Sequence, residues 1–146
     1  MNLDDILKEW ETDCQIGHRL DEASQNTPQL HAKYLNYLTQ TKLILKRSEA
    51  LQNILLKDKF LWYSGKMSRE DIDSRGWSHD PFDGLKMMKT DLSYYYESDK
   101  ELQASEAKIT YYRTMVDTLT EIMNVLKWRH STIRNIIDFR KFEAGS

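Results

Sequence analysis

The residues best suited to chemistry lie between Lys57 and Lys66, where three lysines and three aromatic residues fall within one short stretch. Ammonium groups bind phosphates, and flat rings stack on unpaired bases. The stretch therefore predicts contact with single-stranded nucleic acid, with Lys57, Lys59 and Lys66 on phosphate and with Trp62 and Tyr63 on bases. The alternative is a helix end whose rings are buried core, because large aromatic side chains are mostly buried.

Charge is strongly segregated along the chain, although the net charge of the 146 residues is only -2. Residues 41–69 carry seven bases and two acids, and residues 127–146 carry five bases and two acids. Residues 1–26 carry two bases and seven acids, and residues 70–106 carry four bases and ten acids. Because local field matters more than net charge, an anionic partner is compatible with this composition. The alternative is that the blocks pair with one another, within or between subunits.

The composition indicates an elongated helical protein. Charged residues make up 30% of the chain, glycine and proline number only 5 and 2, and the mean hydropathy is -0.71. Such values suit helices that bury a single apolar stripe. The single cysteine, Cys14, excludes an internal disulfide and fits a reducing compartment. No apolar run approaches a membrane span, and the acidic start is unlike a signal peptide, so we expect a cytosolic protein.

The residues that common catalytic sites require are missing. The sequence has no glycine-rich phosphate loop and no serine set between glycines as in a nucleophile elbow. Cys14 and His18 stand four apart, but two ligands do not make a zinc site. No carboxylate lies in an apolar setting that would mark an acid–base pair. We therefore expect no enzyme, no metal and no cofactor.

A long helix is predicted over residues 28–63, after a polar connector at 18–27. Thr27 suits the N-cap and Pro28 the first helical position. Apolar residues then recur about every 3.5 residues up to Tyr63, and Ser64-Gly65 ends the pattern. Residues 64–84 are predicted to be a structured loop in which Ser68 and Asp71 cap one short turn.

A second long helical region is predicted over residues 85–142. Ser98 to Glu101 resembles a capping box, so the helix either restarts there or passes straight through. Beyond it a coiled-coil seam predicts homo-oligomerisation. The seam and its continuation comprise Leu102, Ile109, Tyr112, Val116, Leu119, Met123, Leu126, Ile133 and Ile137.

The first 17 residues read as a short amphipathic helix with acids in its first turn. Leu3, Ile6, Leu7 and Trp10 lie on one face. This face either docks on a partner or folds back on the protein's own core. Together the patterns predict an all-α chain of long helices with coiled-coil-like packing, organised as one helical domain over residues 1–146.

Several short strings in this order resemble the UvsY family of recombination mediators from T-even-type bacteriophages. The most specific are Tyr63-Ser64-Gly65-Lys66 and the closing Phe142-Glu143-Ala144-Gly145. Others are Tyr34-Leu35 to Leu45, Glu49, Lys86 to Lys89, Asp91-Leu92, Tyr96, Arg129, Ile133, Ile137 and Asp138 to Lys141. The resemblance covers nearly the whole chain.

The resemblance implies a homo-oligomeric ring of about six or seven subunits. It implies binding of single-stranded DNA, of the RecA-like recombinase UvsX and of the phage single-stranded-DNA-binding protein, in the cytoplasm of an infected bacterial host. The implied task is to load the recombinase onto strand coated by that binding protein.

The family's basic pair, implicated in DNA binding, matches Lys57 and Lys59, where the second position is often arginine. Trp62 stands where family members carry tyrosine. The departures are largest in residues 66–84. A helical scaffold or adaptor that binds only proteins is the alternative from another functional class.

Overall fold

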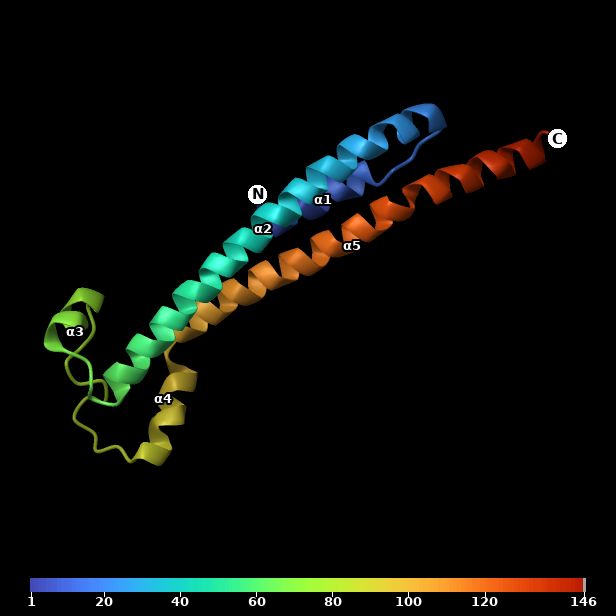
Figure 1. Cartoon of the computed structure of the whole chain (residues 1–146). Coiled ribbons are helices and arrows are strands. Elements are labelled where there is room, and N and C mark those ends of the chain that lie inside the picture. Colours follow the sequence, from blue (N-terminus) through green and yellow to red (C-terminus); the bar gives the residue numbers. More distant parts are fainter. Residues whose placement is uncertain (146) are drawn as a thin grey trace. The chain divides into compact units, whose positions relative to one another are not determined.

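The computed structural model describes residues 1–145 as helices joined by turns and loops, with no strand in that range (Figure 1). The predicted all-α class is confirmed. The helices are α1 (Leu3–Asp13), α2 (Leu20–Tyr63), α3 (Arg69–Arg75), the 3-10 helix η1 (Lys89–Asp91), α4 (Leu92–Ser98) and α5 (Lys100–Glu143). Of these helices, none has the length and apolar character that crossing a lipid bilayer requires.

Contacts within the chain gather into two compact units. The first combines residues 1–43 with the part of α5 that begins at Tyr112, and the second is Ile44–Tyr111. Both units draw on α2 and α5, and each has its own buried side chains. A single domain over the whole chain stays a prediction.

The core of the first unit forms where α1 folds back on α2 and α5. Ile6 is only 1% exposed, and Leu3 and Trp10 pack against the same cluster, while Leu7 stays exposed. Trp10 also meets Tyr34 edge to face, with ring centroids 5.3 Å apart. The buried members of the cluster are Ile6, Tyr34, Leu38, Met115, Leu119, Ile122 and Leu126. Of the two alternatives for this amphipathic face, the structure therefore shows the fold-back.

The predicted start of the long helix is wrong, because α2 already begins at Leu20 and carries Pro28 in its interior. Thr27 is not an N-cap: its hydroxyl donates to the Ala23 carbonyl at 2.9 Å and accepts from Arg129 Nε at 3.2 Å. Ala23 is buried, so packing of this first segment outweighs the hydrogen bond that proline removes. The Thr-Pro signal is local, whereas the contacts that extend the helix are not.

A buried arginine ties α5 to the chain between α1 and α2. The Arg129 guanidinium donates to the carbonyls of Asp13, Cys14 and Gln15 at 3.4–3.5 Å, in addition to its bond to Thr27. These carbonyls lie at and just beyond the C-terminal end of α1, where the helix dipole favours a cation. Arg129 therefore holds the fold-back of α1 in place.

In the second unit, α2 ends in a glycine turn. Gly65 has a φ of 75°, and the Lys66 amide donates to the Leu61 carbonyl at 2.9 Å, as in a Schellman motif. The predicted loop 64–84 contains more helix than the single turn expected, since α3 spans Arg69–Arg75. Its N-cap is Ser68, whose hydroxyl oxygen accepts from the Asp71 amide, and it ends at Gly76.

The expected helical region 85–142 is interrupted. Residues 85–88 are not helical, and α5 starts anew at Lys100. The helix therefore restarts at the predicted capping box, but Asp99 supplies the cap: its Oδ1 accepts from the Leu102 amide at 3.0 Å. The Ser98 hydroxyl instead donates to the Tyr94 carbonyl. This restart places Asp99 beside the end of α2.

Candidate nucleic-acid interface

Lys59, one of the lysines predicted to contact phosphate, is buried in the second unit with 3% of its surface exposed. Its Nζ lies 3.0 Å from Asp99 Oδ2 and 3.5 Å from Glu101 Oε1. The same ammonium lies 4.5 Å from the ring centroid of Trp62 and 4.0 Å from that of Trp77. Two carboxylates and two indole faces thus surround this cation, and this placement argues against direct phosphate contact.

The two rings predicted to stack on bases belong to the same group. The Tyr63 hydroxyl donates to Asp99 Oδ2 at 2.6 Å, and the Trp62 indole N–H donates to the Ser78 carbonyl at 2.8 Å. Tyr63 is buried and Trp62 is half-buried. We call Lys59, Trp62, Tyr63, Trp77 and Asp99 the Lys59 cluster. It joins the end of α2, the chain after α3 and the start of α5.

Burial and hydrogen bonding shift the pKa values of two groups in the cluster. Burial disfavours the charged form of Asp99, but bonds from Tyr63, from the Leu102 amide and from Lys59 outweigh it and lower the pKa of Asp99. Burial, together with the bond to the Asp99 carboxylate, raises the pKa of Tyr63. Asp99 is therefore held ionised and Tyr63 neutral at physiological pH.

The lowered pKa of Asp99 predicts a loss of stability in acid. A carboxyl whose folded pKa lies below its unfolded value stabilises the fold above the unfolded value, about 3.9, and loses this contribution as pH falls through the folded pKa. We expect urea midpoints to be flat near neutrality and to drop steeply below about pH 4. The Asp99→Asn variant should have a lower urea midpoint than wild type at pH 7, and its midpoint should fall less between pH 5 and pH 3. Parallel curves for the two proteins would contradict the assignment.

Four solvent-facing lysines of this unit lie outside the Lys59 cluster. Lys57 is exposed on α2 and shares a helix face with Phe60 and Ser64, at spacings of three and seven residues. Lys66 follows the glycine turn, and Lys89 lies in η1. Lys86 is exposed as well. Within the described part of the chain, none of these four lysines forms an ion pair, so their charge is uncompensated by direct contact.

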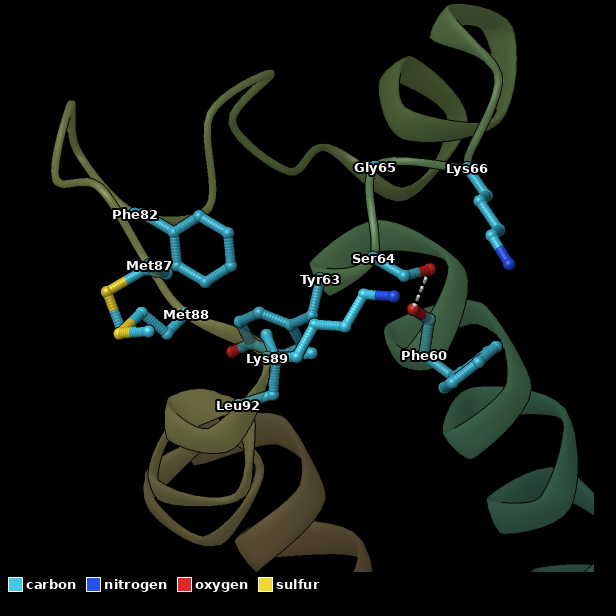
Figure 2. Close-up of a pocket in the computed structure, with 10 residues that line it drawn as sticks. All are labelled: Phe60, Tyr63, Ser64, Gly65, Lys66, Phe82, Met87, Met88, Lys89 and Leu92. Carbon is cyan, nitrogen blue, oxygen red and sulfur yellow. Dashed lines mark hydrogen bonds between the residues drawn. The ribbon is translucent and has the colours of Figure 1, made fainter.

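Two of these lysines, Lys66 and Lys89, line a groove with a cavity volume of about 500 Å³ (Figure 2). Figure 2 shows aromatic rings and two methionines along it, with Lys66 and Lys89 on different sides of Ser64. The groove is lined by Phe60, Tyr63, Ser64, Gly65, Lys66, Phe82, Met87, Met88, Lys89 and Leu92. The lining contains two cations and no carboxylate.

Sequence reasoning identified Lys57 and Lys66 but missed Lys86 and Lys89. These two lie in an acidic segment, which hides them when charge is counted along the chain. Lys89 lines the groove because of the path that the backbone takes over residues 76–88. No local sequence pattern predicts that path. Phe60 is one of the three aromatic residues between Lys57 and Lys66, but the sequence did not predict it as a binding residue.

The seam predicted for oligomerisation mostly packs inside the chain. Leu102, Ile109, Leu119, Leu126 and Ile133 are buried, and Tyr112, Val116 and Met123 pack against the core of the first unit. Only Ile137 has the exposure of a surface residue. The heptad pattern is therefore largely accounted for by packing within one chain.

A different apolar stripe is exposed on α5. Val125, Trp128, Phe139 and Phe142 are large exposed side chains, with Trp128 at 59% and Phe142 at 77%. With Thr132 and Asn135 they follow alternating steps of three and four residues, which places them on one helix face. We call these six residues the outer stripe.

Comparisons with known proteins agree with one another. Residues 9–146 match the model of the family described as "Recombination, repair and ssDNA binding protein UvsY". The recombination protein uvsY of Enterobacteria phage T4 is 29% identical, over 99% of both chains. A crystal structure of the T4 recombination mediator protein UvsY in lattice type II matches with a TM-score of 0.80 and 26% identity, covering 99% of this chain and 98% of that one. The type I lattice gives a TM-score of 0.77 and 25% identity over 95% and 98%. The chain therefore belongs to the UvsY family of phage recombination mediator proteins.

Proposed function

We propose that the protein binds single-stranded DNA and loads a RecA-like recombinase of the UvsX type onto strand coated by a phage single-stranded-DNA-binding protein. The observation that carries the proposal is four exposed lysines that form no ion pair within the described residues, Lys57, Lys66, Lys86 and Lys89, of which Lys66 and Lys89 line the groove at the end of α2. Such cations release counterions when they bind phosphates, which gives sequence-independent affinity. The family's described activities agree with it.

Within this proposal the basic pair has divided roles. Lys57 is exposed and contacts phosphate, whereas Lys59 is enclosed by Asp99, Trp62 and Trp77 and positions the surrounding elements. Trp62 and Tyr63 support the interface from within. This division follows from burial. Lys59 is enclosed, and the Asp99 carboxylate already balances its charge, so Lys59 offers little to a phosphate in solvent.

Assembly completes the proposed mechanism. We propose that copies of the chain meet through the outer stripe of α5 and form a ring of about six or seven subunits. Many weak phosphate contacts then act together, so that avidity supplies affinity while single contacts release easily. Partner proteins bind the acidic segments, residues 1–26 and 70–106. In the first of these segments, Leu7 of α1 is an exposed apolar side chain. No catalytic step is part of the proposal.

Salt titration of single-stranded DNA binding tests the proposal. We expect tight binding at 50 mM salt that weakens steeply by 200 mM. Combining Lys57→Gln, Lys66→Gln and Lys89→Gln should weaken binding and reduce the slope of log K against log salt by about 2, since each phosphate contact on a single strand contributes about 0.7. Fluorescence anisotropy of a labelled oligonucleotide measures both quantities.

A second triple variant controls for net charge. Lys8→Gln, Lys100→Gln and Lys108→Gln remove the same charge from exposed positions that do not line the groove. If both triple variants bind alike, the interface lies elsewhere. If the wild-type protein does not bind at 50 mM salt, the proposed mediator activity is refuted and a scaffold that binds only proteins takes its place.

A further inference from the structure

We infer that the groove at the end of α2 binds an unstacked nucleobase of the single strand, with the flanking phosphates on Lys66 and Lys89. The inference rests on the proposed DNA binding and adds to it a contact with the bases. It moves the base contact away from Trp62 and onto the exposed ring of Phe60. Of the Lys59 cluster, only Tyr63 lines this groove.

The lining of the groove suits a flat aromatic guest. Phe60 is 50% exposed, so much of its surface is open to a ligand. Phe82, Met87, Met88 and Leu92 supply further apolar surface (Figure 2). Methionine side chains adapt to varied shapes, and every base has a π-face, so the site would not select one base over another. The volume of about 500 Å³ lies in the range of sites that take small ligands.

The floor of the groove is fixed before any ligand arrives. The Tyr63 hydroxyl is held by Asp99, and its ring lies 6.0 Å from that of Phe82 and 5.1 Å from that of Tyr96, measured between centroids. A ring already immobilised loses little entropy when a base stacks nearby. Lys59 acts here as a positioning residue, because it pairs with the carboxylate that anchors Tyr63.

Charge complementarity identifies the guest as a phosphate-bearing chain. Lys66 and Lys89 line the groove, and no lining residue is acidic. An acidic apolar peptide has similar chemistry. A helical peptide needs a long groove for anchors spaced over several turns, whereas α2 lines this groove only with Phe60 and Tyr63, about one helical turn. The short groove and the exposed ring favour a single base.

An oligonucleotide without bases separates the two kinds of contact. We compare binding of a 20-residue thymidine strand with that of a 20-residue abasic strand of the same backbone, both at 50 mM salt. Wild-type protein should prefer the thymidine strand by about tenfold or more, because the abasic strand offers only phosphates. Phe60→Leu should lose this preference while keeping its affinity for the abasic strand. Tyr94→Leu removes an exposed ring of α4 that does not line the groove, and it should keep the preference.

The outcomes separate this inference from the proposed function. Equal wild-type binding of the two strands would overturn the base site and leave DNA binding intact, whereas binding of neither would refute the proposed function itself. Methyl NMR of Met87 and Met88 in the wild-type protein tests the base site even if the Phe60→Leu variant misfolds. Their signals should move with the thymidine strand and not with the abasic one. Signals that respond to an acidic apolar peptide and not to the thymidine strand would overturn the inference in favour of a peptide site.

Discussion

Lys59→Met is expected to destabilise the protein by about 3–5 kcal/mol, the cost typical of removing one partner from a buried ion pair. The variant keeps a long apolar stem but leaves the Asp99 carboxylate buried without its cation. It also removes the ammonium that lies against Trp62 and Trp77. Urea unfolding at pH 7, followed by circular dichroism, measures the loss.

Lys57→Met is the matched control, because it changes the same chemistry at an exposed position two residues away. Its stability should stay within about 0.5 kcal/mol of wild type, as for most surface substitutions. Adding Asp99→Asn to Lys59→Met should restore part of the loss, since the unpaired charge is removed. If Lys59→Met kept full stability and lost DNA binding, Lys59 would be a direct phosphate contact and the positioning role would be wrong.

Disrupting the outer stripe is expected to have the largest effect on DNA affinity. Trp128→Ser combined with Phe139→Lys should convert the proposed ring into small species, because both side chains are exposed in the single chain and would be covered by a neighbour. Apparent affinity for long single strands should then fall by about 10²–10⁴-fold as avidity is lost. Sedimentation velocity gives the mass, and anisotropy gives the affinity.

Point substitutions suit this test better than a truncation of α5. Removing the chain after Lys127 would also remove Arg129, which holds the end of α1, and Ile133, which is buried. Leu35→Ser is the control, since it removes an exposed apolar side chain of the same unit from α2. A double variant that sediments like the control at the wild-type mass would exclude the outer stripe as the interface.

Periodicity predicted the helices well and their partners poorly. The step of three and four residues on α5 is real, yet its side chains mostly face α1 and α2 of the same chain. A heptad pattern records that a face is buried and does not record which chain buries it. The outer stripe follows the same steps but is broken by Thr132 and Asn135, so it did not stand out in the sequence.

The chemistry of Lys59 was hidden for a related reason. A lysine beside aromatic residues looks identical in sequence whether it faces a ligand or a carboxylate. The deciding group, Asp99, lies 36 residues beyond Tyr63 along the chain, and only the turns around α3 and α4 bring it back. By contrast, the glycine turn after Tyr63 depends on neighbouring residues alone, so it could be predicted.

The placement of the tryptophans gives the protein a built-in optical probe for each unit. Trp62 and Trp77 flank Lys59 in the second unit, whereas Trp10 and Trp128 belong to the first. A chain carrying Trp10→Phe and Trp128→Phe emits only from the indoles that enclose the ammonium. The complementary pair of substitutions leaves emission only from the first unit. Fluorescence can therefore follow the melting of each unit separately, without an attached dye.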